Sequence, residues 1–192
     1  MANKIVDITT YQSINNTRKY FIDTNALYWY TYPRFINNLS PQAKPYYNFI
    51  DSLVAANNPL ITSIYNISEL LNVIEKNEFE IYKSTNSDNP YISRKDFRRM
   101  PSERQKLQNM MKTTLQNVYA ICNVIEFPFD KLNMDQFVDT LTSHRCDVFD
   151  YVIIQNNIKE EMTNIITDDN DFSTIPNITI YTTNIYPLPD ID

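Results

Sequence analysis

The stretch Lys19-Tyr20-Phe21-Ile22-Asp23-Thr24-Asn25 decides how this chain is expected to fold. Its apolar run is typical of a short strand buried on both faces, and the polar residues that follow are good helix caps. A second stretch, Asn164-Ile165-Ile166-Thr167-Asp168-Asp169, has the same form. Reactive groups in open α/β sheets lie beyond the carboxyl ends of the strands. These two strand ends are therefore expected to place several carboxylates around one crevice.

Further strands and helices alternate along most of the sequence. Short strands are predicted at 60–62, 121–127 and 178–181, the last of them at an edge of the sheet. Apolar residues at helical spacing predict helices over 41–54, around 67–74 and from about 147, and cap residues predict one from about 26. A long polar helix is expected over 102–120 and a further helix over 134–143. This order predicts an α/β fold with a mainly parallel sheet. No linker divides residues 1–192, so we expect one domain with an irregular tail at about 183–192.

The composition excludes several classes of site. The chain has no glycine, so it cannot contain a Walker A loop, a dinucleotide-binding fingerprint or a glycine-flanked nucleophile elbow. Its single histidine, His144, excludes a two-histidine zinc site. Turns that need a positive φ must use Asn or Asp, for example at 57–59 and 168–171.

Charge, cysteine content and hydropathy limit the expected partners and cellular location of the protein. The net charge of −6 argues against coating of nucleic acid through overall charge. Two cysteines are too few for a disulfide framework, and the N-terminus lacks the pattern of a secretory signal. No stretch approaches the roughly 18 continuous apolar residues of a membrane span. We therefore expect a soluble cytoplasmic protein with no membrane partner.

Acidic residues occupy four positions where a metal site can form: Asp23, Glu69, Asp150 and Asp169. Asp147 lies three residues before Asp150 and would share its helix face. Taken singly, an acid near a helix start is an ordinary dipole partner or cap, and this alternative stays open. Gathering several of these carboxylates at one crevice lowers the stability of the fold, because two like charges ~4 Å apart repel by about 4 kcal/mol at an effective dielectric near 20. Mg²⁺ or Mn²⁺ would offset that repulsion, and an all-oxygen site suits these ions better than zinc.

Four segments, taken together in order and spacing, resemble the motif set of PIN domains. They are Phe21-Ile22-Asp23-Thr24-Asn25, Ser68-Glu69-Leu70, the run from Asp147 to Ile154, and the run from Ile166 to Phe172. PIN domains are metal-dependent ribonucleases that include the VapC-type toxins of bacterial toxin–antitoxin pairs. The resemblance covers about residues 19–183 and implies a three-layer α/β/α architecture around the parallel sheet.

The resemblance also implies roles for individual residues. The catalytic acids would be Asp23, Glu69, Asp150 and Asp169. The metal ligands would come from these four together with Asp147 and Asp168, and Asp168 could exchange roles with Asp169. Residues that orient the acids or a bound water would be Thr24, Asn25 and Thr167, although Thr24 and Asn25 fit a simple helix cap equally well. The implied reaction is metal-assisted hydrolysis of RNA phosphodiester bonds.

A basic helical insertion at about 77–114 makes the chain longer than compact PIN domains. Residues 94–112 carry seven Lys and Arg against two Asp and Glu, a net charge of +5 within an acidic chain. This segment could contact RNA phosphates, bind an acidic partner such as an antitoxin, or form a solvated helix face. The candidate RNA-binding residues are Arg94, Lys95, Arg98, Arg99, Arg104 and Lys106.

Three functions follow from these observations. The first is a Mg²⁺- or Mn²⁺-dependent endoribonuclease, either the toxin of a toxin–antitoxin pair or an RNA-processing enzyme, with a homodimer as a further possibility. The second is a catalytically silent PIN-like protein that binds RNA or a protein partner through the basic segment. The third, a phosphotransfer enzyme with Asp23 as phosphoryl acceptor, is weaker because the expected partner acids and lysine are not evident.

Overall fold

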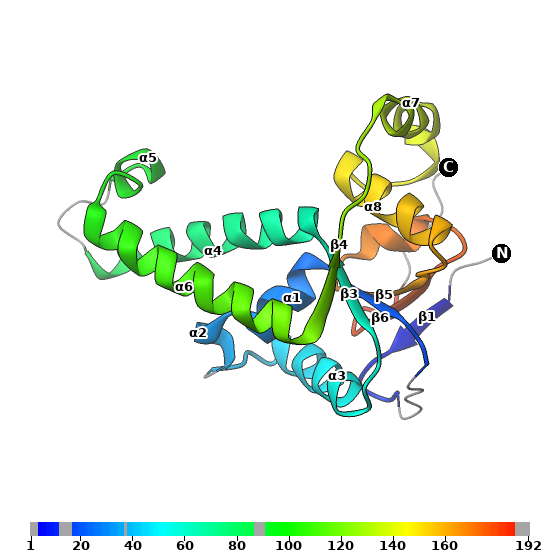
Figure 1. The fold of residues 1–192 in the computed structure, drawn as a ribbon, viewed down its shortest axis with the longest axis horizontal. Coiled ribbons are helices and arrows are strands. Elements are labelled where there is room, and N and C mark those ends of the chain that lie inside the picture. Colours follow the sequence, from blue (N-terminus) through cyan, green and yellow to red (C-terminus); the bar gives the residue numbers. More distant parts are fainter. Residues whose placement is uncertain (1–3, 12–16, 37, 87–90, 187–192) are drawn as a thin grey trace.

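A computed structural model describes residues 4–11, 17–36, 38–86 and 91–186. Its centre is a six-stranded sheet in which every pairing is parallel, in the order β1-β6-β5-β2-β3-β4 (Figure 1). The strands are β1 (Lys4–Asp7), β2 (Tyr20–Ile22), β3 (Leu60–Ser63), β4 (Cys122–Ile125), β5 (Asn164–Ile166) and β6 (Thr179–Thr182). The predicted α/β fold with a central parallel sheet is confirmed.

Helices cover both faces of the sheet and complete three layers. They are α1 (Thr24–Thr31), α2 (Pro33–Ile36), α3 (Ala43–Ala55), α4 (Ile64–Thr85), α5 (Arg94–Phe97), α6 (Pro101–Ile121), α7 (Lys131–Thr140) and α8 (Val148–Lys159), with short 3-10 helices η1 (Leu141–Ser143) and η2 (Asn170–Thr174). One buried cluster joins α1, α3, α4 and α6 to the sheet, and another joins α8 to its opposite face.

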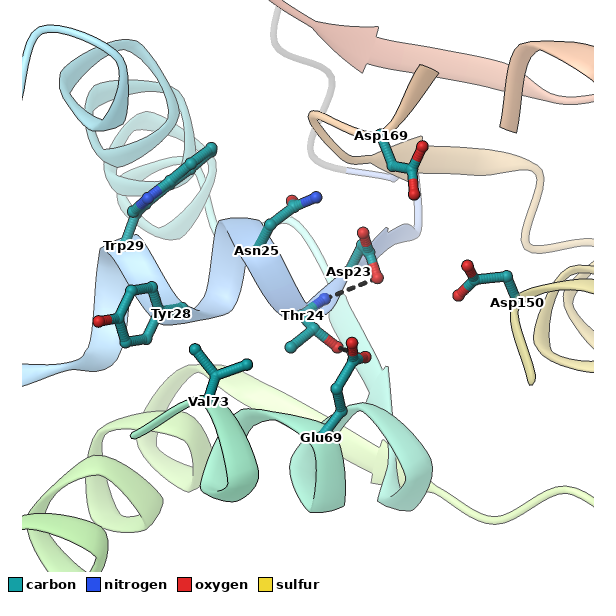
Figure 2. Close-up of a pocket in the computed structure, with 9 residues that line it drawn as sticks. All are labelled: Asp23, Thr24, Asn25, Tyr28, Trp29, Glu69, Val73, Asp150 and Asp169. Atoms are coloured by element: carbon teal, nitrogen blue, oxygen red, sulfur yellow. Dashed lines mark hydrogen bonds between the residues drawn. The ribbon is translucent and has the colours of Figure 1, made fainter. Parts of the chain in front are cut away.

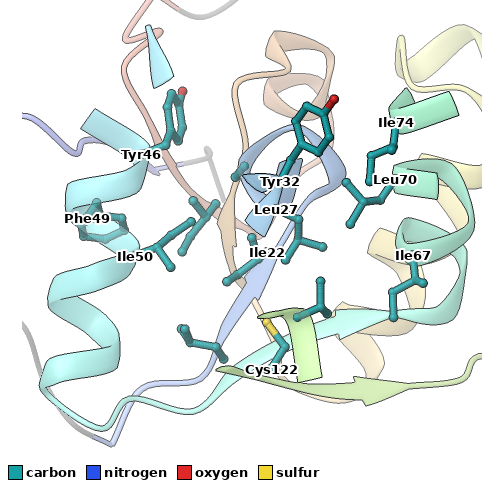
Figure 3. Close-up of a cluster of buried hydrophobic side chains, with 14 of the residues drawn as sticks. Ile22, Leu27, Tyr32, Tyr46, Phe49, Ile50, Ile67, Leu70, Ile74 and Cys122 are labelled. Carbon is teal, nitrogen blue, oxygen red and sulfur yellow. The ribbon is translucent and has the colours of Figure 1, made fainter. Parts of the chain in front are cut away.

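The side chains of strand β2 contribute to both buried clusters. Side chains alternate along a strand, so Tyr20 and Ile22 point into the first cluster and Phe21 points into the second. All three are fully buried, as the continuous apolar run predicts. Figure 3 shows Ile22 among side chains from α1, α3 and α4, including Leu27, Ile50 and others of the first cluster.

The order of strands creates a crevice next to β2. After β2 the chain builds β3 and β4 on one side, and it then returns to place β5 and β6 on the other side. In the register of the sheet Ile22 is paired with Ile166, and the Asp23 N–H donates to the Ile166 carbonyl at 3.0 Å. Asp23 and Thr167 therefore emerge side by side at the carboxyl edge, where ligands bind in open α/β sheets.

Two predictions about the sheet margin are wrong. The N-terminal strand β1 was not predicted, because its run Lys4-Ile5-Val6-Asp7 contains only two apolar residues. It pairs along the whole of β6, so the strand predicted at the edge lies between two others. The partners are more than 170 positions apart in sequence, and no local pattern reports such a pairing.

The turns without glycine follow the prediction in part. Among the described residues, positive φ occurs at Asn57 (54°), Glu161 (56°) and Asn177 (68°). Asn57 confirms the predicted turn after α3, whereas Glu161 contradicts the expectation that such turns use only Asn or Asp. The predicted use of positive φ at 168–171 is wrong, because Asp169 has a φ of −79° and caps η2 from an extended conformation.

The insertion forms a helical hairpin. The long helices α4 and α6 lie side by side and project beyond the sheet, with α5 at the far end (Figure 1). Helix α4 continues to Thr85, further than its apolar face predicted, while α6 matches the predicted helix closely. Part of the predicted tail, residues 187–192, lies outside the described residues. None of the helices in the described ranges is long and apolar enough to cross a membrane.

Candidate metal centre

A cavity of about 210 Å³ lies at the carboxyl edge of the sheet. The four acids that line it come from separate segments: Asp23 follows β2, Glu69 lies on α4, Asp150 on α8, and Asp169 follows β5. Figure 2 shows their carboxylates directed toward a common space, with Thr24 between Asp23 and Glu69. The structure thus brings together four acids that are up to 146 positions apart in sequence.

Asp23 is the most firmly held of these acids. It is only 5% exposed and is the N-cap of α1. Its Oδ1 accepts hydrogen bonds from the Thr24 N–H at 2.7 Å and from Asn66 Nδ2 at 3.1 Å, and its Oδ2 accepts from Thr167 Oγ1 at 2.7 Å. Three donors from three segments therefore fix the orientation of one carboxylate. The cap role and the site role, which the sequence offered as alternatives for this region, coexist here.

Asn66 links two of the acids, and it was not among the site residues predicted from the sequence. Its buried amide donates both to Asp23 and to Thr24 Oγ1 at 3.1 Å, and the Thr24 hydroxyl donates to Glu69 Oε2 at 2.6 Å. Its own carbonyl accepts from Ser63 Oγ at 2.5 Å. The signal was a polar residue one helical turn before Glu69, a spacing that places both on one face of α4.

Thr167 and Asn25 join the ends of β2 and β5. Thr167 Oγ1 donates to Asp23 and accepts from the Asp169 N–H at 3.0 Å. Asn25 accepts from the Asp168 N–H at 3.2 Å and donates to Thr167 Oγ1 at 3.4 Å. The two residues therefore position the segment that carries the fourth acid, and Asn25 also lines the cavity.

Asp168 and Asp169 point in different directions. Asp169 lines the cavity, and its Oδ1 accepts from the Asp171 N–H at 2.8 Å as the cap of η2. Asp168 instead accepts from Tyr46 Oη and from Gln42 Nε2, both at 2.7 Å, next to α3. Of the two candidates that the sequence left open, Asp169 is the one that faces the other acids.

Asp147 shapes the helix that presents Asp150. As the N-cap of α8, its Oδ1 accepts from the Phe149 N–H at 2.8 Å and from the Asp150 N–H at 3.0 Å. Asp147 does not line the acidic cavity but a second cavity beside it, which Asp150 and Glu69 also line. Its position is therefore that of a neighbour to the four acids.

Burial and mutual repulsion raise the pKa values of the acids. Burial raises the pKa of Asp23 to about 7, helped by charge on Glu69 and Asp169 and opposed by hydrogen bonds from Thr167 and Thr24. Burial and the charge of Asp23 and other acids raise the pKa of Asp150 to about 8. The pKa of Asp169 is also raised, mainly by burial. Such values indicate a site that lacks compensating positive charge.

The donor set fits a hard divalent cation. Four carboxylates with no histidine suit Mg²⁺ or Mn²⁺, and Asp23, Glu69, Asp150 and Asp169 are the residues that would hold the ion. Within the part of the chain that the structure describes, no three Asp, Glu, His or Cys side chains are close enough to enclose a metal. Binding would therefore require the carboxylates to move closer together. Glu69 is exposed and Asp150 half-buried, so both have room to do so.

Three arginines of the basic insertion form ion pairs within the hairpin. Glu75, a largely buried residue of α4, accepts from Arg94 Nη2 and from Arg98 Nε, both at 2.8 Å, and Arg104 Nη1 lies 3.7 Å from it. These contacts tie α5 and the start of α6 to α4. Three of the six candidate RNA-binding residues thus have a structural role that the sequence did not indicate.

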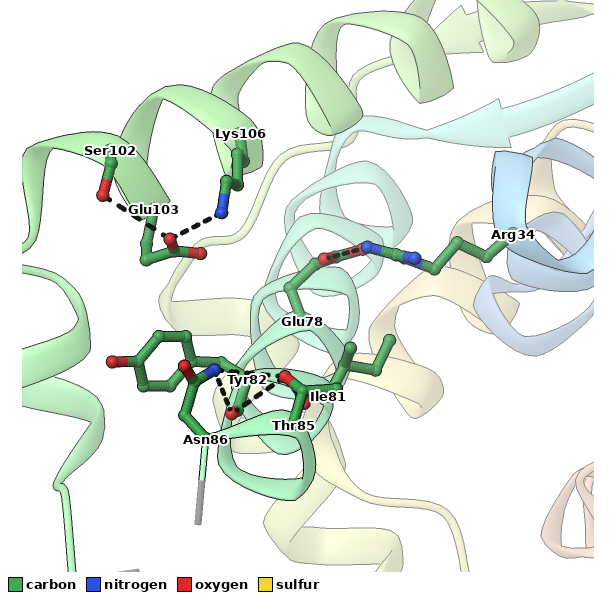
Figure 4. A network of polar contacts seen from close by, with 9 residues as sticks. All are labelled: Arg34, Glu78, Ile81, Tyr82, Thr85, Asn86, Ser102, Glu103 and Lys106. Atoms are coloured by element: carbon green, nitrogen blue, oxygen red, sulfur yellow. Dashed lines mark hydrogen bonds and ion pairs between the residues drawn. The ribbon is translucent and has the colours of Figure 1, made fainter. Parts of the chain in front are cut away.

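Two more candidates of this segment pair with acids three residues earlier in the chain, Arg99 from the turn after α5 and Lys106 within α6. Arg99 lies 3.6 Å from Asp96, and Lys106 lies 2.7 Å from Glu103, the latter shown in Figure 4. Lys95 is exposed at the start of α5. Figure 4 also shows the pair between Arg34 and Glu78, which ties α2 to the hairpin. Lys106 thus lies on an exposed helix face, one of the alternatives weighed above, whereas Arg99 lies in an exposed turn between α5 and α6.

Fold and site together define a class: an α/β protein with a carboxylate-lined cavity at the carboxyl edge of a parallel sheet. No family model and no curated protein matches the sequence. Among solved structures, the chain is similar to a chain in the crystal structure of VapBC2 from Rickettsia felis bound to a DNA fragment from the promoter. The TM-score is 0.50 at 18% identity, over 85% of this chain and 98% of that one. At this identity the likeness concerns the fold.

Proposed function

We propose that the protein is a Mg²⁺- or Mn²⁺-dependent endoribonuclease with a PIN-like fold. The observation that carries the proposal is the convergence of four carboxylates from four segments on one cavity, with raised pKa values at Asp23, Asp150 and Asp169. A protein gains no stability from such an arrangement by itself. A function that neutralises the acids with a cation accounts for it, and the motif resemblance points to RNA hydrolysis.

The proposed reaction assigns a role to the bound ion and to each of the four acids. A bound ion would lower the pKa of a coordinated water and stabilise charge on the phosphoryl and leaving oxygens. Asp23, fixed by three donors, would hold a constant position in the site, while Asp169 and the more exposed Glu69 and Asp150 would complete the ligand set. Without a cation the acids would repel an RNA phosphate, so RNA affinity at the cavity should depend on the metal.

The VapBC2 likeness supports a more specific proposal, in which the protein is the toxin of a toxin–antitoxin pair. An antitoxin, a second copy of the chain and the RNA substrate are its proposed partners, in the cytoplasm. The silent alternative, with the basic segment as the binding surface, is less favoured. Arg94, Arg98 and Arg104 are engaged with Glu75, which leaves less free positive charge than the sequence suggests.

Cleavage of single-stranded RNA with and without Mn²⁺ tests the proposal. We expect metal-dependent cleavage that falls at least about tenfold in Asp23→Asn, equivalent to about 1.4 kcal/mol of barrier. Asp139→Asn, which alters an exposed acid on α7, is the matched control and should cleave like the parent. RNA binding without cleavage at any Mn²⁺ concentration would favour the silent alternative.

A further inference from the structure

A second cavity, of about 270 Å³, adjoins the acidic one. Glu69 and Asp150 line both cavities, so the two share a wall. The remaining lining includes two aromatic rings, Tyr65 and Phe149, and two polar side chains, Ser68 and Asn72. An aromatic ring fits in an apolar cavity of about 150 Å³, so this cavity has room for the ring system of a nucleobase.

Phe149 is exposed and packs against two further aromatic rings. Phe149 is 50% exposed, and it stacks on Phe129 with ring centroids 5.0 Å apart and an interplanar angle of 20°. Tyr65 closes the group, with centroids 5.8 Å from Phe129 and 6.2 Å from Phe149. The Tyr65 hydroxyl donates to the Phe127 carbonyl at 3.0 Å, which fixes its ring. Keeping such a group at the surface forgoes the free energy of burying it.

We propose that Tyr65 and Phe149, with Phe129 stacked against Phe149 outside the cavity lining, form a stacking platform for a nucleobase next to the scissile phosphate. The platform rests on the proposed nuclease function and names a binding subsite within it. A base bound there would belong to a nucleotide adjacent to the acidic cavity, because the cavities share Glu69 and Asp150. Aromatic rings bind bases of any sequence by stacking, typically with about 1–3 kcal/mol per base.

The other lining residues favour a base over an apolar peptide. Glu69, Asp147 and Asp150 line the cavity, and an apolar segment covering them would remove carboxylate charge from water. Asn72 Nδ2 donates to the Ser68 carbonyl at 3.0 Å, which orients the amide, and the Asn72 and Ser68 side chains both line the cavity. Such groups can bond the polar edge of a base, which an apolar side chain does not present.

Asp147 couples the platform to the acids. Its carboxylate caps the N–H groups of both Phe149 and Asp150, so the ring and the acid are held on one turn of α8. Movement of this turn would displace the platform and one proposed metal ligand together. The sequence singled out Asp147 as an extra acid, and this geometry gives it a positioning role for both neighbours.

Replacement of Phe149 tests the platform with two readouts. Phe149→Leu keeps an apolar residue but removes the ring, and it should lower kcat/KM for single-stranded RNA in Mn²⁺ at least about fivefold. Phe149→Trp keeps a stacking ring at this position. Its added fluorescence, relative to the parent containing Trp29, should be quenched by an oligoribonucleotide but not by an abasic oligomer of equal length. Val138→Ala, an exposed apolar residue on α7, is the control and should cleave like the parent.

The outcomes separate the platform from the nuclease function. If the parent cleaves RNA but Phe149→Leu cleaves equally well, or if the abasic oligomer quenches as strongly, the platform is refuted and the nuclease stands. A platform made for a protein partner would give this same result. If the parent does not cleave but only base-containing oligomers quench Phe149→Trp, the nuclease fails and base binding stands. If the parent neither cleaves nor binds RNA, both fail.

Discussion

At the scale of single residues, Asp23 shows how one side chain serves folding and site together. Its carboxylate caps α1, receives Asn66 from α4 and Thr167 from the end of β5, and is almost fully buried. Each donor lowers the free energy of the charged form, yet burial still raises the pKa of Asp23 to about 7. The residue is thus held in place before any ligand arrives.

The two adjacent acids after β5 should differ in function. Asp169 faces the cavity, whereas Asp168 accepts from Tyr46 and Gln42. We predict that Asp169→Asn lowers metal-dependent RNA cleavage at least about tenfold, while Asp168→Asn lowers the melting temperature and keeps cleavage within about threefold of the parent, less than 1 kcal/mol of barrier. Cleavage assays and thermal melts of both variants check this, and the reverse pattern would move the fourth acid to Asp168.

The raised pKa values predict how stability depends on pH without metal. Asp23 and Asp150 hold protons in the folded state up to about pH 7 and 8, well above their ordinary values. Their stabilising contribution is complete below about pH 4 and is lost as the pH rises through 7–8. The metal-free protein should therefore melt at a lower temperature at pH 9 than at pH 5.

Asp150→Asn separates this effect from the overall charge. The amide cannot ionise, so the melting temperature of the variant should fall less between pH 5 and pH 9 than that of the parent. For a chain of this size the two falls should differ by at least about 3 °C. The control is Asp139→Asn, which removes the same charge from an exposed site. Melts in EDTA measure the difference, and equal slopes for parent and Asp150→Asn would contradict the assigned cause.

At the scale of elements, the helical hairpin depends on one acid. Glu75 of α4 gathers Arg94, Arg98 and Arg104 from α5 and α6. Glu75→Ala would leave these three charges to repel one another. We expect a loss of about 1–2 kcal/mol, because the arginines are 40–51% exposed and solvent screens them.

The loss corresponds to a fall of about 3–6 °C in melting temperature. Asp96→Ala, which removes the partner of Arg99 at an exposed site, should shift the melt by less than about 2 °C. Helix content followed by circular dichroism during melting checks both variants. A melt of Glu75→Ala identical to that of the parent would show that the hairpin does not rely on this cluster.

The elements also show what the sequence could and could not predict. Strands such as β2 and β5 were predictable because their apolar runs end in cap residues, and the long polar helix expected over 102–120 matches α6. The strand β1 was not, because its identity depends on pairing with β6 rather than on its own residues. The three arginines were predicted as free charges because only the hairpin brings Glu75 to them.

The candidate site also combines residues that the sequence predicted with residues that only tertiary contacts reveal. Spacing and order identified Asp23, Glu69 and Asp150, because each stands at the start or near the start of a helix. The choice between Asp168 and Asp169 needed the cap of η2 and the contact with Tyr46, which are tertiary. Asn66 was missed for the same reason, since an asparagine on a helix gains its role only from what it faces.

At the scale of the whole molecule, the sheet topology concentrates negative charge. The strand order reverses at β2, and this opens the crevice at the carboxyl ends of β2 and β5 where the acids meet. The basic hairpin extends away from the sheet on long helices (Figure 1). Acidic and basic regions are thus kept apart by the fold, with the acids gathered where α1, α4, α8 and β5 converge.

Calorimetric titration with Mn²⁺ tests the central claim, that these acids form one cation site. At pH 8 the parent is expected to bind Mn²⁺ saturably, with a dissociation constant in the range of micromolar to millimolar. Asp23→Asn is expected to bind at least about tenfold more weakly, a loss of about 1.4 kcal/mol, and Asp139→Asn to bind like the parent. Absence of saturable Mn²⁺ binding by the parent, or equal binding by Asp23→Asn, would contradict the account.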